Sequence, residues 1–443
     1  MGDRREQPSN YRSTRLPSQR GPRRHYCTTL RLTSLLRSKA AGDPRFPWRK
    51  MELQRTIGGT RYSIEFLLDV LTENDDAFGD KEKIEKVEET LISKDRGFGS
   101  NIFSVKLTSV EGNAHSVVCK IPTAQYLNEY LHKCNSEAKT LSDEEVRMQE
   151  EINITQVRET HNREVDFYRF AKEKFPKCLK IPRFLYGEYM SESNEGIVIM
   201  EDLSGKVDKG PSSGLSKAEA IAMVDAICEL QVQCLMNQEF VEKSFRPVES
   251  LVKCIRGFTL LTAEDLLKNE KYTWFCQEVA DNISSMVEFE KLVKVMASRP
   301  ELGMPPVVCH GDLWPTNILW QSQENGTRDL LAIIDWQDCY IGNYATDLAS
   351  ILAVNMDVEM RKSSEKELLE HYVIKMNAYK QKYDLKIDLT YEKVHTAYKK
   401  ALQVSVLLTM SLLGNPEDVV DNGDGMGRLT RRFMHMLEDV EFE

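Results

Sequence analysis

The chain has 443 residues, of which 41% are hydrophobic and 29% are charged, the balance of a globular protein with a sizeable core. Its net charge is −10. Residues 1–50 hold 13 Lys and Arg against three acids, which leaves the remaining residues with a net charge of −20. Nucleic acid requires a basic face, so this acidic body favours a small-molecule partner and no nucleic acid.

Residues 1–50 differ in composition from the rest. They are rich in Arg and Ser and poor in acids, which is typical of a mitochondrial targeting peptide, a disordered basic tail or an extension upstream of a start at Met51. The ten cysteines form no C-x-x-C pair and indicate reduced thiols in a cytoplasmic protein. The longest apolar run, at 401–414, is too short to cross a bilayer and predicts a core helix, so we expect no integral membrane association.

The next part of the chain predicts strands combined with helices. Ser63 begins a helical pattern that runs to Asn74. The segments 101–110 and 115–122 alternate as two strands joined by the turn EGNA. A polar stretch from 123 predicts helix and ends in ETHNREVDFYRFAKEKF, and the apolar run at 196–205 predicts a buried strand.

The second half is predominantly helical in pattern. Ser216 and Glu219 form a capping box at the start of a long helix. Three short strands are predicted later, in PPVVCH, NILW and LLAIIDW. The stretch VDKGPSS lies between the halves as a connector. We therefore predict an α+β protein with a β-rich N-terminal lobe at 51–203 and a mainly helical C-terminal lobe at 204–443.

The motif HGDLWPTN and the later IDW carry the candidate chemistry. Asp312 is followed by Asn317 five residues later, and Asp335 stands at the end of an apolar strand. A carboxylate at the end of a buried strand is energetically unfavourable unless it has a partner. Phosphoryl transfer uses one Asp for the acceptor hydroxyl and an Asn with a second Asp for Mg²⁺. We assign Asp312 as the catalytic base, Asn317 and Asp335 as metal ligands, and His310 as a brace within the catalytic loop.

This order is similar to the protein-kinase motifs H-R-D-x-x-x-x-N and D-F-G, so the first lobe should hold the matching parts. Gly97 and Gly99 precede a strand, where backbone N–H groups suit phosphate, and Ser100 is a further phosphate contact. Ile102 replaces the third glycine of the motif. Lys120 matches the strand lysine that binds the α- and β-phosphates. Three residues match the hinge beside the adenine, namely Met200, Glu201 and Asp202.

Together these motifs resemble the choline-kinase-like and ecdysteroid-kinase-like (CHK) family, in particular its uncharacterised nematode branch, which is related to aminoglycoside phosphotransferases. The resemblance covers residues 51 to 443. It implies a two-lobed protein-kinase-like fold, ATP and Mg²⁺ as cofactors, and transfer to a hydroxyl of a choline-, sterol- or sugar-like molecule. It also implies that Glu164 pairs with Lys120, and that Asp347 braces the catalytic loop. The long stretch between Lys120 and Glu164 departs from the pattern.

Three other interpretations remain open at this point. The incomplete glycine loop is compatible with an inactive pseudokinase that binds nucleotide. A protein kinase is disfavoured because HGD lacks the Arg of H-R-D and because no APE-like segment follows Asp335. A metal hydrolase built on His310 and Asp312 lacks a second nearby His. The acid that follows the IDW motif closely, Asp338, is interpreted as a loop residue.

Overall fold

The computed structural model describes residues 47–93, 99–138, 141–174, 179–207, 214–245, 248–297, 300–410, 413 and 427–440. These residues belong to one compact unit. Gly97 and nearly all of the connector at 207–213 lie outside the described residues, as does the basic segment up to residue 46.

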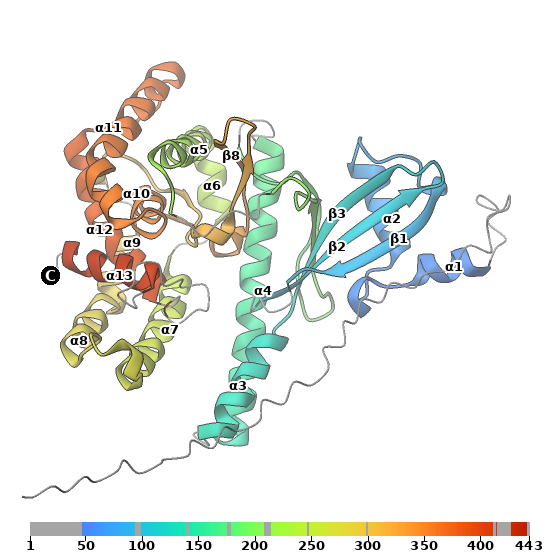
Figure 1. Cartoon of the computed structure of the whole chain (residues 1–443), viewed down its shortest axis with the longest axis horizontal. Helices are drawn as coiled ribbons and strands as arrows, with labels where there is room; N and C mark the ends of the chain where they lie inside the picture. Colours follow the sequence, from blue (N-terminus) through green and yellow to red (C-terminus); the bar gives the residue numbers. More distant parts are fainter. Residues whose placement is uncertain are drawn as a thin grey trace, which may run out of the picture. The chain divides into compact units, whose positions relative to one another are not determined.

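The N-terminal part contains a five-stranded antiparallel sheet in the order β1-β2-β3-β5-β4 (Figure 1). Its strands are β1 (Ile84–Leu91), β2 (Ser100–Ser109), β3 (Ala114–Pro122), β4 (Phe184–Glu188) and β5 (Ile197–Glu201). Strands β2, β3 and β5 lie where the alternating and apolar patterns predict them. The sequence did not indicate β1, because half of its side chains are charged, which is usual for an edge strand that must not pair with another chain.

Helix α2 (Ile64–Asn74) covers one face of this sheet. Ser63 caps the helix by accepting a hydrogen bond from the Phe66 N–H, as predicted. The buried side chains of α2 join those of β2 and β3 in a hydrophobic core of their own. The short helix α1 (Pro47–Gln54) precedes it.

The polar stretch after β3 forms two helices, α3 (Gln125–Ala138) and α4 (Asp143–Lys174). Helix α4 is 32 residues long and contacts both β4 and the C-terminal half of the chain. Its buried positions recur at three and four residues through the second half of the helix, so one face is apolar. The long insertion between Lys120 and Glu164 is therefore regular helix that leads into the face carrying Glu164.

The rest of the chain is mainly helical and surrounds a second, larger core. Its helices are α5 (Lys217–Met236), α6 (Gln238–Ser244), α7 (Glu249–Lys268), α8 (Gln277–Met286), α9 (Phe289–Met296), α10 (Ala345–Ala349), α11 (Val358–Tyr383), α12 (Tyr391–Met410) and α13 (Arg428–Asp439). Two small antiparallel sheets pair β6 (Val307–Cys309) with β9 (Tyr340–Gly342), and β7 (Ile318–Ser322) with β8 (Arg328–Ile333). The capping box at the start of α5 is formed as predicted.

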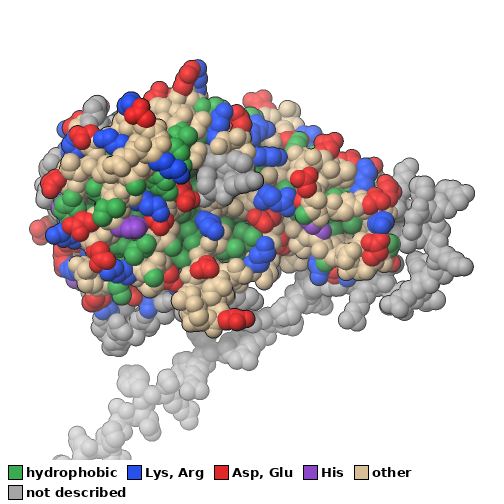
Figure 2. Space-filling view, turned by 90° about the horizontal axis from the view of Figure 1, so that it is seen from above, with side chains coloured by type: hydrophobic (Ala, Val, Ile, Leu, Met, Phe, Trp, Pro, Cys, Tyr) green, Lys and Arg blue, Asp and Glu red, His purple; other side chains and the backbone are tan. Residues whose placement is uncertain are grey.

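Acidic and basic side chains are interspersed on the face shown in Figure 2, without one large basic patch. Within the described part of the chain, no helix combines the length and the apolar character needed to cross a membrane.

Candidate active site

Lys120 lies on the face of β3 that is opposite to the N-terminal core. Side chains alternate along a strand, so Val117, Cys119 and Ile121 pack into the core under α2. Lys120 therefore points the other way, toward α4. Its side chain is only 6% exposed, so the strand brings a lysine into an environment where it requires a charged partner.

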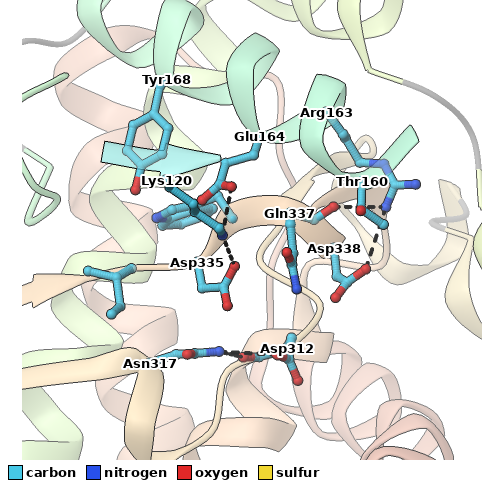
Figure 3. A network of polar contacts seen from close by, with 12 residues as sticks. Lys120, Thr160, Arg163, Glu164, Tyr168, Asp312, Asn317, Asp335, Gln337 and Asp338 are labelled. Carbon is cyan, nitrogen blue, oxygen red and sulfur yellow. Dashed lines mark hydrogen bonds and ion pairs between the residues drawn. The ribbon is translucent and has the colours of Figure 1, made fainter. Parts of the chain in front are cut away.

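Two carboxylates supply that partner, and they come from distant parts of the sequence (Figure 3). The Lys120 Nζ atom lies 2.7 Å from Glu164 Oε2 on α4 and 2.6 Å from Asp335 Oδ1, just after β8. The pairing of Lys120 with Glu164, which the resemblance implied, is present in the structure. Lys120 also contacts Asp335 directly, which the sequence did not indicate.

The electrostatics of this triad follow from one cation shared by two acids. Burial alone would lower the pKa of Lys120, but the adjacent Asp335 and Glu164 carboxylates outweigh it and raise that pKa. Burial raises the pKa of Glu164, whose side chain is 1% exposed. The nearby Asp335 carboxylate raises this pKa further, whereas Lys120 lowers it. Lys120 therefore stays charged, and the triad carries an excess of negative charge.

Asp335 occupies a strained backbone position. Its φ is 64° and its ψ is 64°, the left-handed region that residues other than glycine rarely adopt. It directly precedes the short 3-10 turn η6 (Trp336–Asp338). Backbone strain of this kind is retained where the surroundings hold it in place, and it is concentrated at functional sites.

The loop after β6 carries His310, and its backbone is braced as the resemblance implied. The backbone N–H of His310 donates to Asp347 Oδ2 at 2.8 Å, and the N–H of Gly311 donates to Asp347 Oδ1 at 3.4 Å. Gly311 has a φ of +81°, and a Cβ at this position would meet the backbone oxygen of Asp338 at 2.5 Å. Only glycine fits this turn without strain.

The His310 ring links the loop after β6 to the segment between β8 and Asp335. Nδ1 accepts from the Asp312 N–H at 3.2 Å, so Nε2 carries the proton and donates to Ile334 O at 2.9 Å. The bond that Nδ1 accepts requires the neutral ring, and burial lowers the pKa of His310 to about 4. This geometry suits the bracing role, because the Nδ1 lone pair that could accept a proton is already used by the Asp312 N–H.

Asp312 and Asn317 meet on the two sides of this loop (Figure 3). The Asn317 Nδ2 atom donates to Asp312 O at 2.9 Å and to Asp312 Oδ2 at 3.1 Å. Burial raises the pKa of Asp312, and the nearby carboxylates of Asp338 and Asp335 raise it further. Asp312 is thus a carboxylate whose affinity for a proton is increased by its position.

The donor atoms present suit a hard cation such as Mg²⁺. Both described hydrogen bonds of the Asn317 side chain use Nδ2, which leaves Oδ1 as a ligand, and Asp335 keeps its Oδ2. Within the described residues, no group of three or more His, Cys, Asp or Glu is placed to hold a metal. Mg²⁺ in nucleotide sites takes one or two carboxylates and completes its shell with water and phosphates, so Asn317 and Asp335 fit this ion.

The predicted phosphate loop is described only in part. Gly97 is outside the described residues, whereas Gly99 directly precedes β2 and Ser100 is its first residue. A Cβ at Gly99 would lie 3.9 Å from the Oε1 atom of Gln337, on the loop after Asp335. Gly99 therefore lies close to the loop that follows Asp335.

The predicted hinge residues lie at and after the end of β5. Met200 is 7% exposed, with its Sδ 4.0 Å from the hydroxyl of Tyr168. Glu201 accepts from the Arg183 N–H at 2.8 Å. Asp202 accepts from the hydroxyl of Ser104 at 2.6 Å. Each of the three side chains therefore has a contact within the protein, and their part in a hinge stays a prediction.

Two further residues at the site were not assigned from the sequence. Arg163 of α4 lies 3.8 Å from Asp338 Oδ1 and donates to the backbone oxygen of Gln337 at 3.1 Å. Asp338, interpreted as a loop acid, is one of the carboxylates that raise the pKa of Asp312. The sequence offered only their positions as a signal: Arg163 directly precedes Glu164, and Asp338 lies three residues after Asp335.

A cavity of about 960 Å³ lies elsewhere, between residues 303–306 and the segment that joins α11 to α12. None of the candidate site residues lines it.

Comparison with known proteins gives two curated relatives, both from Caenorhabditis elegans. "Uncharacterized oxidoreductase dhs-27" is 25% identical over 335 residues, which cover 73% of this chain and 39% of that protein. "Uncharacterized kinase-like protein D1044.1" is 27% identical over 295 residues, which cover 63% of this chain and 71% of that protein. The chain thus spans about two-fifths of the first relative. Both are nematode proteins, in agreement with the branch that the motifs resemble.

Solved structures also show a likeness. A Plasmodium vivax ethanolamine kinase gives a TM-score of 0.41 at 13% identity, covering 88% of this chain and 91% of that one. A putative aminoglycoside phosphotransferase from Ralstonia eutropha gives 0.41 at 14% identity, covering 85% and 96%. Both scores lie below 0.5, so neither likeness establishes the fold of this chain.

A family model does match most of the sequence. The model of DUF1679, described as "Uncharacterized oxidoreductase dhs-27", covers residues 64–441, which include Lys120, Glu164, Asp312 and Asp335. The chain therefore belongs to the DUF1679 family.

Proposed function

We propose that this chain is an ATP- and Mg²⁺-dependent phosphotransferase that acts on a hydroxyl group of a small molecule. We further propose a two-lobed protein-kinase-like fold, with an N-lobe at 51–203 and a C-lobe at 204–443, and membership of the CHK group. The name of the relative D1044.1, a kinase-like protein, agrees with this proposal.

One observation supports it above all others. Lys120 contacts Glu164 at 2.7 Å and Asp335 at 2.6 Å, although these residues come from a strand, a helix and a loop far apart in the sequence. Phosphoryl-transfer sites of the kinase type require a strand lysine paired with a helix glutamate beside a metal-binding Asp. A structural ion-pair group would explain the carboxylates next to Lys120, but it gives no reason for the strained backbone of Asp335.

In the proposed mechanism each residue positions or neutralises charge. Lys120, held by Glu164, binds the phosphates of ATP. Asn317 and Asp335 hold Mg²⁺, which when bound supplies charge neutralisation on the phosphates. Asp312 accepts the hydrogen bond of the acceptor hydroxyl, aligns its oxygen and receives its proton as transfer proceeds. Catalysis then comes mainly from alignment and electrostatic stabilisation.

A thermal-shift titration tests the nucleotide site. A ligand that binds the native state raises stability by RT ln(1+[L]/Kd). We expect ATP with Mg²⁺ to raise the melting temperature of the wild type and to do so far less in Asp335→Asn. Asn tolerates the left-handed backbone of this position, so the variant removes the charge without adding strain. Asp329→Asn is the matched control, because Asp329 is exposed on β8 and lies six residues earlier.

Transfer itself is tested with labelled ATP and a panel of choline, sterol and amino-sugar acceptors. Label on a small molecule supports the proposal. Nucleotide binding without transfer to any acceptor would favour the pseudokinase, and label on a protein acceptor would favour a protein kinase. The absence of a nucleotide shift at millimolar ATP and Mg²⁺ would contradict a nucleotide site.

A further inference from the structure

Helix α4 presents two neighbouring charged residues to opposite ends of one loop. Glu164 reaches Lys120, which in turn contacts Asp335 at the start of the loop. Arg163 reaches the other end, where its Nη1 atom donates to Gln337 O at 3.1 Å and lies 3.8 Å from Asp338 Oδ1. The Arg163 side chain is only 9% exposed, so the contact is largely shielded from water.

The middle of the loop is also fixed to α4. The ring of Trp336 is fully buried and stacks on Phe167 with centroids 3.7 Å apart and planes within 8°. Helix α4 thus holds the loop directly at Trp336 and at Gln337, and indirectly at Asp335 through Lys120. A loop held in this way retains the left-handed backbone of Asp335, which would otherwise relax.

The residues that Arg163 holds point toward the candidate phosphate site. In Figure 3 the side chains of Gln337 and Asp338 extend toward the region between Asp335 and Asp312. The Gln337 amide also approaches the glycine loop, with its Oε1 3.9 Å from a Cβ built at Gly99. Displacement of this loop would therefore move a metal ligand and a side chain that faces the phosphates.

The positive charge of Arg163 also offsets the carboxylates around it. Asp338 is one of four carboxylates in the network of Figure 3, together with Glu164, Asp312 and Asp335. Without Arg163, Lys120 would be the one cation among these drawn side chains. A carboxylate left without its cation at a partly buried site repels its neighbours and moves toward water.

We propose that Arg163 is a positioning residue for the nucleotide site: it clamps Gln337 and Asp338 to α4, so that binding of Mg²⁺-ATP depends on a side chain that touches neither. This inference rests on the proposed function, because it assigns Asp335 and the loop after it to metal and phosphate. It means that α4 positions this loop through Arg163 as well as through Glu164.

The test compares three arginine variants by calorimetric titration with a non-hydrolysable ATP analogue and Mg²⁺. We expect Arg163→Ala to weaken binding about 10- to 100-fold, the usual cost of removing a residue that orients a metal ligand. Arg163→Lys keeps the charge but lacks the planar fork, so it should recover part of the loss. Arg169→Ala is the matched control, because Arg169 lies on the same helix but donates to Gly187 O and stacks on Tyr189.

Further readouts separate positioning from general destabilisation. The Mg²⁺ concentration for half-maximal nucleotide binding should rise in Arg163→Ala, whereas the KM for the acceptor should stay near that of the wild type. Asp338→Asn should reduce the effect of Arg163→Ala when the two are combined, since the neutral side chain no longer needs the cation. If Arg163→Ala does not fold, Arg163→Lys and Asp338→Asn test whether this clamp supports binding of the nucleotide.

The outcomes distinguish the two proposals. Wild-type protein that binds no nucleotide overturns the proposed function and this inference with it. Wild-type binding together with unchanged binding in Arg163→Ala, or an equal loss in Arg169→Ala, overturns the inference alone.

Discussion

Two groups of buried charge in this molecule look alike at first and differ in what surrounds them. One is the network around Lys120, and the other lies between α11, α12 and α13 around Arg361. The Arg361 side chain is 2% exposed and contacts Asp439 and Glu365. The Tyr398 hydroxyl donates to Glu365 at 2.7 Å, and Lys399 donates to the backbone oxygen of Asp439 at 2.8 Å.

The two groups differ in charge balance and in strain. Among the described residues, the group around Arg361 contains two cations and two carboxylates: Arg361 contacts both carboxylates, and Lys399 donates to the backbone oxygen of Asp439. These residues lie on helices with regular backbone. In the other network two cations, Lys120 and Arg163, contact three carboxylates, one of them at a strained position, and Asp312 adds a fourth carboxylate nearby. Burial of charge alone therefore does not indicate a functional site. An excess of acid on a strained loop does, because it provides for a cation that the chain does not supply.

The largest expected effect is a loss of turnover on changing the network around Lys120. Asp312→Asn keeps the size of the side chain but removes its ability to take a proton, so we expect turnover to fall by about 10²- to 10⁴-fold. Nucleotide binding should persist, since Asp312 is assigned to the acceptor. Asp329→Asn, on the exposed part of β8, should have wild-type turnover. Wild-type turnover in Asp312→Asn would remove Asp312 from the mechanism.

Removal of the central cation should destabilise both groups but affect nucleotide in one. Lys120→Met and Arg361→Met each remove a buried cation from two carboxylates, a change that costs at most about 3–5 kcal/mol of unfolding free energy. Urea unfolding should show comparable losses. Only Lys120→Met should lose the stabilisation by ATP and Mg²⁺. Loss of nucleotide binding in Arg361→Met would mean that general destabilisation, and not the site, governs binding.

Acid should weaken the region around α4 through a buried histidine. The His161 Nε2 lies 2.8 Å from the backbone oxygen of Glu188, and burial lowers the pKa of His161 to about 4 from its usual 6.5. Between these pH values the unfolded chain binds a proton that the folded chain does not. Stability should therefore fall as the pH drops from 6.5 to 4, by about 3 kcal/mol at most from this residue.

His161→Gln tests this expectation, because the amide can still donate to Glu188 and does not titrate. Urea midpoints measured at pH 7 and pH 5 should differ less in the variant than in the wild type. An equal difference in both proteins would show that His161 contributes nothing to the acid sensitivity.

The smallest expected effect concerns metal alone. EDTA should abolish the stabilisation of the wild type by ATP while leaving the melting temperature of the free protein within about 1 °C. The free protein should be insensitive because the proposed ion is held largely by nucleotide phosphates. A large fall in melting temperature on chelation without nucleotide would indicate a structural metal instead.

Parts of this site were accessible from the sequence because they are encoded locally. Asp312, Asn317 and Asp335 stand at fixed spacing beside apolar strands, and Lys120 follows from its strand pattern. The contact of Lys120 with Asp335 was not accessible, because it depends on how the chain folds back over 215 residues. The role of Arg163 was hidden for the same reason, since a polar position on an amphipathic helix has no local signal that names its partner.

The fold shows the same division. Amphipathic and alternating patterns predicted α2, α5, β2 and β3, where burial of one face determines the sequence. The strand β4 was missed, because five residues that are mostly buried give too short a pattern to separate from a loop. The regular helix between Lys120 and Glu164 was anticipated only in general terms, because most of its first half is exposed and polar.

The most direct test of the central claim is a calorimetric titration of the wild type and Asp335→Asn with a non-hydrolysable ATP analogue, with and without Mg²⁺. If the contact between Lys120 and Asp335 marks a nucleotide site, the wild type binds the analogue, Mg²⁺ tightens the binding, and Asp335→Asn loses the Mg²⁺ dependence. Absence of binding by the wild type, or the same Mg²⁺ dependence in both proteins, would contradict the claim.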